Sequence, residues 1–471
     1  MKTQLVGSPH LYSLEQSAIT FFPDTEGEAV CTVTHDERGV TARTIITLPE
    51  GKSACRECTE AVDTQRNEQK AIKLSFYDAA CELRNMKEPW GALTGVRPAK
   101  LARSLLESGL TKNQTRDTLK KEYRLSAEKA ELCVTAGLKA YNIKRKLRER
   151  DACIYIGIPF CPSRCVYCSF ISVAAGKNDE GKIEEYVQAL CREIRESAEG
   201  SLFSGRTIKA VYIGGGTPAM LSPAQLIRVV AALKSAYNIP EGIEFTIEAG
   251  RPDAITKEKL HAIKLVEADR LSVNPQTTDD EVLIKIGRHH TSKEIVDTYH
   301  EAKKVGFGSI NMDIIAGLPL KNEDDDGLES FCRTIDDVVS LAPENITVHT
   351  FALKRGSFLN EYHLSIPDSE TVYKMLEYAE ENLKAQGYEP YYLYRQKYMT
   401  GNMENIGWTK RGYESLYNIC MMEELCDIIS FGAGGVSKLT DGRKIKRITN
   451  HKYPKEYIYN IDEMIKRKRG E

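Results

Sequence analysis

The stretch CIYIGIPFCPSRCVYCSF, residues 153–170, joins a run of β-branched and aromatic residues to three closely spaced cysteines, Cys161, Cys165 and Cys168. The apolar run predicts a buried strand, and the cysteines follow it on a loop whose backbone is restricted by Pro159 and Pro162. Three interpretations are open for such a loop: a metal site, a redox dithiol, or three thiols that lie close together without a shared role.

The chain after this stretch repeats the pattern of a strand followed by a helix. The strand-like runs are CIYIGI, KAVYIGGG, IEFTIEAG, DRLSVNP, SINMDIIAG and ITVHTFAL, and segments of helical period separate them. This alternation predicts βαβ units with a parallel sheet of six strands, and right-handed crossovers would curl the sheet into a barrel. Six units are fewer than the eight of a closed barrel, so we expect an α/β fold with a partial (β/α)6 barrel over residues 151–365.

Two further domains are predicted on either side of the barrel. Residues 1–150 begin with the apolar runs AITFF (18–22), AVCTVT (29–34) and TARTIITL (41–48), which predict strands, and then change to a helical period. They are interpreted as an N-terminal α+β domain. Residues 366–471 begin with a predicted helix and are interpreted as a C-terminal extension specific to the protein's family.

Composition limits the location and the partners of the protein. A formal net charge of -2 over 471 residues gives no electrostatic basis for binding nucleic acid. No apolar stretch approaches the roughly 20 residues of a membrane span, and the N-terminus has no apolar signal core, so we expect a cytoplasmic protein. Its 13 cysteines are then expected to be reduced. Cys55 and Cys58 form a CxxC pair without a second pair at metal spacing, and their role stays open.

The position of the three loop cysteines favours an iron–sulfur cluster. They follow the first barrel strand, at the C-terminal end of the barrel, where barrel enzymes place their catalytic residues. A [4Fe–4S] cluster takes four thiolates, so three from one loop would leave one iron open to another ligand. A structural zinc site normally needs a fourth protein ligand, which no nearby residue supplies, and a redox dithiol needs only two cysteines.

This arrangement resembles the radical S-adenosylmethionine (radical SAM) superfamily, in which CxxxCxxC follows the first barrel strand. The flanking YIGIPFC and CVYCSF are similar to the branch that contains oxygen-independent coproporphyrinogen III oxidase. Further motifs of that branch are IGGGTP (213–218), Glu248, RLSVNPQT (270–277), IGRHH (286–290), NMDIIAGLP (311–319) and VHTFALKRGS (348–357). GALTGVRPAK (91–100), LYRQKYMTGNMENIGW (393–408) and SFGAGGVSK (430–438) are similar to signatures of the HemZ-type coproporphyrinogen dehydrogenases.

The resemblance implies two cofactors and the residues that hold them. A [4Fe–4S] cluster would be bound by Cys161, Cys165 and Cys168. Bound SAM would be contacted in a first pocket by Tyr155, Gly215 and Glu248, and a second SAM pocket would be lined by Gly216, Thr217, Gln276, Arg288, Asp313 and Ala352. His289, His290 and His349 are candidates for contacts to propionates or to tetrapyrrole nitrogens. No catalytic residue is assigned.

Several of these residues also have a physical interpretation of their own. The glycines at 214–216 lack Cβ atoms and would let a ligand approach the backbone closely. Glu248, at the end of a predicted strand, could accept hydrogen bonds from ribose hydroxyls, or it could instead pair with a buried arginine. Arg288 and Asp313 could contact a ligand or could form an ion pair with each other.

The implied activity is oxidative decarboxylation of two propionates of coproporphyrinogen III to vinyl groups, which gives protoporphyrinogen IX in anaerobic haem biosynthesis. The implied partners are a tetrapyrrole substrate and an electron donor such as flavodoxin or ferredoxin. The chain departs from the established oxidases at two positions, because it has Phe170 where they carry a further cysteine and Gly157 where they carry a histidine. The alternatives are a haem-binding chaperone and a radical SAM haem-degrading methyltransferase. The haem-binding element of such chaperones is matched by LYNICMMEEL, which retains Asn418 but neither its histidine nor its tryptophan.

Overall fold

The computed structural model describes residues 1–471 except 24, 38, 63, 169, 171, 201–202, 323, 353–363, 397–402 and 441–444. Two compact units, Met1–Leu138 and Lys139–Glu471, make up the chain. Among the described helices, none has both the length and the apolar character that crossing a membrane requires. Parts of the motifs at 348–357 and 393–408 lie outside the described residues. The division into domains 1–150, 151–365 and 366–471 stays a prediction.

The first unit contains a four-stranded sheet in the order β1-β2-β3-β4. Its strands are β1 (Lys2–Val6), β2 (Glu28–Asp36), β3 (Gly39–Thr47) and β4 (Ser53–Glu60), and its helices are α1 (Leu11–Phe21), α2 (Gln65–Arg84), α3 (Pro98–Glu107) and α4 (Lys112–Tyr123). The prediction of a strand at AITFF was wrong, because this run forms the end of α1. Leu14, Ala18 and Phe21 recur at helical spacing and are buried in the core between this helix, α2 and the sheet.

Cys55 and Cys58 both lie on β4. Successive side chains of a strand point to opposite faces, so two residues three positions apart lie on different faces of the sheet. Cys58 packs against the core, and Cys55 accepts a hydrogen bond from Arg43 at 3.3 Å. This placement does not favour a shared metal or a dithiol at the CxxC pair.

The second unit is built on an 11-stranded sheet whose centre confirms the predicted partial barrel. The six predicted strands are present as β5 (Asp151–Ile158), β8 (Thr207–Gly215), β9 (Glu244–Gly250), β10 (Arg270–Val273), β11 (Ser309–Ala316) and β12 (Asn345–Thr350). They are parallel and lie side by side in chain order. The short strands β6 (Phe160–Cys161) and β7 (Val173–Ala174) pair with each other and close the base of the cysteine loop.

The C-terminal part of the chain adds strands to both edges of this sheet. β15 (Asp427–Phe431) pairs in parallel with β5, and β16 (Val436–Thr440) and β17 (Ile445–Thr449) continue from it. At the opposite edge, β14 (Glu404–Thr409) pairs antiparallel with β12, and β13 (Glu389–Arg395) pairs with β14. The parallel core is therefore covered at both edges by strands that are distant in sequence.

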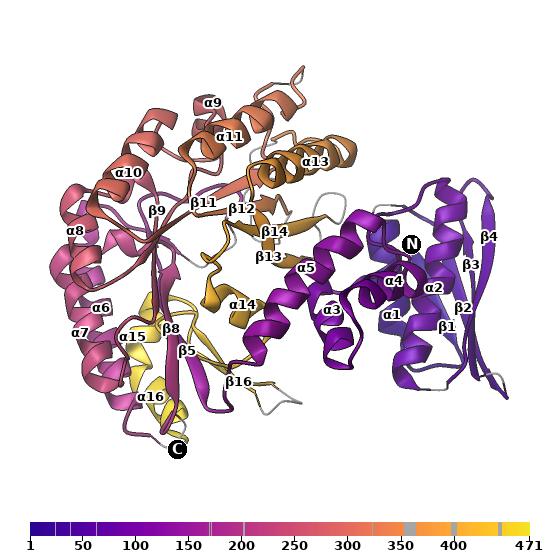
Figure 1. Cartoon of the computed structure of the whole chain (residues 1–471), viewed down its shortest axis with the longest axis horizontal. Helices are drawn as coiled ribbons and strands as arrows, with labels where there is room; N and C mark the ends of the chain where they lie inside the picture. The colour runs from indigo at the N-terminus through magenta and orange to yellow at the C-terminus, as the bar shows by residue number, and fades with distance from the viewer. Residues whose placement is uncertain are drawn as a thin grey trace. The chain divides into compact units, whose positions relative to one another are not determined.

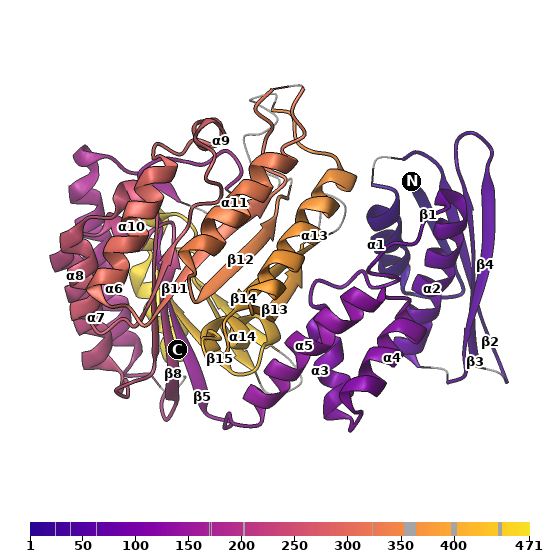
Figure 2. The ribbon, with the colours of Figure 1, turned by 45° about the horizontal axis from the view of Figure 1, so that its top comes forward.

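Helices cover the outer face of the curved sheet (Figures 1 and 2). They are α6 (Glu180–Ser197), α7 (Pro223–Ala236), α8 (Lys257–Leu265), α10 (Ser292–Val305), α11 (Leu328–Leu341) and α13 (Ser369–Ala385), with α15 (Pro454–Tyr459) and α16 (Ile461–Arg469) packed against α6. The short α9 (Asp280–Lys285) follows β10, and α5 (Ala127–Lys144) spans the boundary of the two units. α14 (Leu416–Glu423) lies on the inner side, where it contacts both β13 and β8.

Candidate active site

A cavity of ≈ 360 Å³ lies inside the barrel and extends from the cysteine loop to α14. On β11 its lining residues are Ser309, Asn311, Asp313 and Ile315, which alternate because every second side chain of a strand points inward. Of the twelve predicted ligand-contacting residues, ten line the cavity: Cys161, Cys165, Cys168, Gly215, Gly216, Glu248, Gln276, Arg288, Asp313 and Ala352. Tyr155 and Thr217 do not line it.

The cysteine loop is tied to the turn after α9. Val166 N donates to the carbonyl oxygen of Ile286 at 3.1 Å, and Ser163 Oγ donates to that of Gly287 at 2.7 Å. Gly287 has φ +77°, and a Cβ atom there would lie 3.0 Å from the Arg164 carbonyl oxygen. A glycine is therefore required for this close approach.

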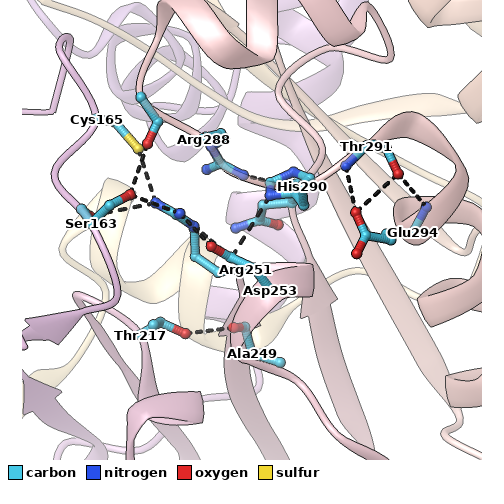
Figure 3. A network of polar contacts seen from close by, with 12 residues as sticks. Ser163, Cys165, Thr217, Ala249, Arg251, Asp253, Arg288, His290, Thr291 and Glu294 are labelled. Carbon is cyan, nitrogen blue, oxygen red and sulfur yellow. Dashed lines mark hydrogen bonds and ion pairs between the residues drawn. The ribbon is translucent and has the colours of Figure 1, made fainter. Parts of the chain in front are cut away.

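Arg251, directly after β9, supplies a buried positive charge to the cysteine loop (Figure 3). Its guanidinium lies 3.4 Å from Cys165 Sγ and 2.9 Å from Ser163 Oγ. Asp253 holds the other side of the guanidinium at 2.7 Å and lies 3.7 Å from His290. Burial opposes ionisation of Asp253, but its interactions with His290 and Arg251 outweigh burial and keep the pKa of the carboxyl well below its usual range.

Arg288 joins the cysteine loop to the end of β10. Its guanidinium donates to the Asn274 carbonyl oxygen at 2.5 Å and to Tyr167 Oη at 3.2 Å. Neither bond involves Asp313, so the structure does not contain the ion pair that the sequence left open. Arg288 is 5% exposed and lines the cavity, which places a permanent positive charge at its wall.

The glycine-rich end of β8 allows the strand, the cysteine loop and the cavity to meet. Gly216 N donates to the Ile158 carbonyl oxygen at 2.8 Å, and a Cβ at Gly216 would lie 2.4 Å from the Phe160 carbonyl oxygen. Thr217 is buried, and its hydroxyl donates to the Ala249 carbonyl oxygen at 2.5 Å (Figure 3). Thr217 therefore connects the ends of β8 and β9 instead of facing the cavity.

Glu248 faces the cavity from the end of β9. Its Oε2 accepts a hydrogen bond from Gly215 N at 3.3 Å. Burial, and then the negative charge of Asp313, raise the pKa of Glu248 to about 7. Tyr155 lies behind this wall, where its ring stacks with those of Tyr212 and Tyr417. Tyr212 lines the cavity beside Glu248, whereas Tyr155 does not line it. Tyr155 therefore supports the cavity wall by packing against Tyr212.

Asp313 and His349 form a pair of polar residues on the cavity wall. Asp313 lies 3.8 Å from His349 Nε2 and accepts a hydrogen bond from Asn311 at 2.8 Å. Burial opposes its ionisation, but its interactions with His349, Asn311 and Thr347 outweigh burial, so the pKa of Asp313 lies below its usual value. Of the three candidate histidines, only His349 lines the cavity.

Several polar atoms on the wall are left without a partner by the protein itself. Thr246 Oγ1, Asn274 Oδ1, Gln276 Oε1 and Arg288 Nε are buried and have no hydrogen-bond partner within the part of the chain that the structure describes. Gln276 also has a left-handed backbone with φ +67°, which is uncommon for a residue other than glycine and is often found at ligand sites. Such groups fit a polar ligand with several donors and acceptors, as SAM has.

Comparison with known proteins identifies the family. The family model "Radical SAM superfamily" matches residues 155–332. The oxygen-independent coproporphyrinogen-III oxidase-like protein HemZ of Bacillus subtilis (strain 168) is 38% identical over 378 residues, 79% of this chain and 74% of HemZ. The chain belongs to this family of radical SAM proteins. The heme chaperone HemW of Escherichia coli (strain K12) is 26% identical over 307 residues, 65% of this chain and 75% of HemW.

The fold is similar to that of coproporphyrinogen III oxidase (HemN) from Escherichia coli. The TM-score is 0.56 at 23% identity, over 70% of this chain and 73% of HemN. Radical SAM proteins use a [4Fe–4S] cluster and SAM, and these are the cofactors of this chain. The donors fit both groups, because three thiols of one loop and unpartnered polar atoms line the same cavity.

The structure gives a physical reason for one of the two departures of this radical SAM chain from its oxidase relatives. A Cβ at Gly157 would lie 3.3 Å from the Ala433 carbonyl oxygen and 3.5 Å from the Tyr155 ring. The loop after β15 therefore packs closely against this position, and a side chain there would require the loop to move by a few tenths of an ångström. Phe170 is 66% exposed and lines the mouth of the cavity.

The loop after β15 is connected to the end of β5 through Tyr186, whose hydroxyl accepts a hydrogen bond from Ala433 N at 2.9 Å. Tyr186 on α6 donates to the Gly157 carbonyl oxygen at 2.7 Å, and Gly432 N donates to Glu193 at 2.8 Å. Glu193 forms an ion pair with Lys468, and both side chains are fully buried. The signature SFGAGGVSK therefore positions the strand from which the cysteine loop begins.

Proposed function

We propose that this radical SAM enzyme oxidatively decarboxylates two propionates of coproporphyrinogen III to vinyl groups. The observation that carries the proposal is the cavity, which runs from the cysteine loop to a far wall of tyrosines and amides. Tyr391, Tyr392 and Tyr394 of β13 and Asn418 of α14 line that wall. Aromatic faces and amide groups suit a pyrrolic macrocycle with polar substituents. HemZ, the relative at 38% identity, is named as an oxygen-independent coproporphyrinogen-III oxidase-like protein, which supports a substrate of this class.

The proposed roles of the residues follow from their positions. Cys161, Cys165 and Cys168 would hold the [4Fe–4S] cluster, and Arg251 would offset its negative charge through Cys165. Glu248 would accept hydrogen bonds from the ribose of SAM. Gly215 and Gly216 would allow SAM to lie against the backbone, and Tyr155 would support this pocket through its stack with Tyr212.

A second SAM pocket is proposed beside Glu248, along the ends of β10 and β11. Gln276, Arg288 and Asp313 would provide its polar groups, and Ala352 would form its apolar side. Gly216 borders both pockets, and Thr217 would act by fixing the strand end rather than by contact. Two bound SAM molecules would match two successive decarboxylations.

When bound, the cluster and SAM supply the one-electron cleavage of SAM. This cleavage gives methionine and a 5′-deoxyadenosyl group that abstracts hydrogen. Each propionate loses one hydrogen atom from its β-carbon to that group, then releases CO2 and one further electron, and a vinyl group remains. An electron donor such as flavodoxin or ferredoxin would start each cycle. The chain itself binds and orients the macrocycle and limits the access of water around it.

The proposal is tested by anaerobic incubation of the reconstituted enzyme with SAM, reductant and coproporphyrinogen III, followed by mass spectrometry. Two successive losses of CO2 are expected. Formation of 5′-deoxyadenosine with an intact porphyrinogen would refute the proposed substrate, and stable binding of unaltered haem by the same sample would then assign the chain to the chaperones. Consumption of haem with a methylated linear product would assign it to the degrading methyltransferases.

A further inference from the structure

Three buried cysteines that the radical SAM site does not use come together at the base of the barrel. They are Cys153 on β5, Cys420 on α14 and Cys426 just before β15, and we name them the thiol triad. Their Sγ atoms all lie within 4.8 Å of one another. Their exposed fractions are 0%, 0% and 6%. We propose that the thiol triad is a second metal site, which binds a soft divalent cation of the Zn²⁺ type through three thiolates.

The sulfur spacing fits a shared metal ion. A Zn–S bond of ≈ 2.3 Å in tetrahedral geometry places two ligand sulfurs about 3.8 Å apart. Cys153 Sγ and Cys426 Sγ are 3.7 Å apart. A disulfide needs sulfurs about 2 Å apart and would use only two of the three cysteines. Three convergent thiols from three separate elements are the arrangement that a thiolate-bound cation requires, with one coordination position left for an external ligand.

The charges around the thiol triad are compatible with such a site. Three thiolates and one divalent cation carry a net charge of -1, since binding releases three protons. Two acidic residues that neighbour the thiol triad in sequence are already paired, Asp151 with Lys209 at 3.8 Å and Asp427 with Arg206 at 2.7 Å. Lys438 brings a positive charge to the same region, because its Nζ lies 3.2 Å from the sulfur of Met421, the residue after Cys420.

The position of the thiol triad would let a bound metal connect the cavity wall to the rest of the barrel. Cys153, Cys420 and Cys426 lie in one apolar core with Tyr417, which stacks on Tyr212 with ring centroids 4.6 Å apart. Tyr212 in turn lines the catalytic cavity. A metal at the triad would fasten α14 to β5 and β15 and would hold the inner wall of the cavity in place.

The test uses the full chain with its three loop cysteines, residues 161, 165 and 168, replaced by alanine, so that no iron–sulfur cluster can form. The protein is purified anaerobically under reductant, stripped with a chelator and titrated with Co²⁺ and then Zn²⁺. About one equivalent of Co²⁺ with thiolate charge-transfer absorption is expected, displaced by Zn²⁺. Cys420→Ser and Cys426→Ser should lose this absorption, whereas Cys191→Ser, at a buried cysteine of α6, should keep it.

A second measurement does not depend on the folding of these variants. X-ray absorption of the Zn²⁺-loaded chain should show three sulfur neighbours at about 2.3 Å. A shell of only nitrogen and oxygen neighbours would overturn the proposal. So would the absence of tight Co²⁺ binding, binding that survives Cys426→Ser unchanged, or a Cys153–Cys426 disulfide in metal-free protein isolated without oxidant.

Discussion

Replacing Glu248 with glutamine should stabilise the barrel at alkaline pH although it removes a group proposed to bind SAM. The pKa of Glu248 is raised from 4.5 to about 7, first by burial and then by Asp313. The folded state therefore retains a proton that the unfolded chain has already released. The stability this proton provides is fully present below the unfolded pKa and is lost as the pH rises through about 7. By linkage, a carboxyl displaced this far costs at most about 3 kcal/mol once it is ionised in the folded state.

Glutamine carries no charge and can still accept the hydrogen bond from Gly215 N. Glu248→Gln should therefore exceed the wild type in free energy of unfolding by up to about 3 kcal/mol near pH 8, with a gain about half as large near pH 5.5. Guanidinium unfolding followed by tryptophan fluorescence measures this in a Trp90→Phe background, where buried Trp408 of β14 is the single tryptophan and reports on the barrel unit. Glu241→Gln, at an exposed position before β9, is the control. A gain that is equal at both pH values, or a loss at pH 8, would refute the reasoning.

Three further changes test the supports of the site. Lys468→Met leaves the buried Glu193 carboxylate without its cation and should cost about 3–5 kcal/mol by the same fluorescence assay. Lys466→Met, at an exposed position of the same helix, should be nearly neutral, and equal losses in the two variants would contradict this. Gly216→Ala places a methyl group 2.4 Å from a carbonyl oxygen of β6 and should abolish SAM binding, which calorimetry measures. Gly181→Ala, in open space, should leave SAM binding intact. An unchanged affinity of Gly216→Ala for SAM would contradict this prediction. Arg251→Met removes a positive charge beside a cluster cysteine and should lower the cluster's reduction potential by on the order of 50 mV. An EPR-monitored redox titration measures this shift. An unchanged potential would exclude the proposal that Arg251 offsets the charge of the cluster.

The six barrel strands and the cysteine loop could be predicted because short stretches of sequence indicate each of them. The six parallel strands each form a β-branched run bounded by helical segments, and the cysteine loop follows the first of them directly. Parallel strands present their carboxyl ends at one side of a sheet, so motifs after successive strands were expected to converge, and ten of the predicted residues line one cavity. The run AITFF was misassigned because its apolar residues were considered without Leu14, which completes the helical spacing.

The long-range parts could not be predicted in this way. Nothing in the local pattern of 427–431 indicates that this strand pairs with β5, some 270 residues earlier in the chain. For the same reason the tyrosines of β13 and the thiol triad were not connected with the barrel. Arg251 was missed because a lone arginine after a strand carries no sequence signal, and its contact with Cys165 depends on how two loops fold against each other. Thr217 has a motif position typical of a ligand contact, but its hydroxyl is used by the backbone of β9.

The measurement that tests the central claim most directly follows one hydrogen atom. Coproporphyrinogen III deuterated at the β-carbons of its propionates is incubated anaerobically with the reconstituted enzyme, SAM and reductant, and the 5′-deoxyadenosine is analysed by mass spectrometry. We predict one deuterium in each 5′-deoxyadenosine, with one molecule formed for each CO2 released. Unlabelled 5′-deoxyadenosine, formed without release of CO2, would contradict the account.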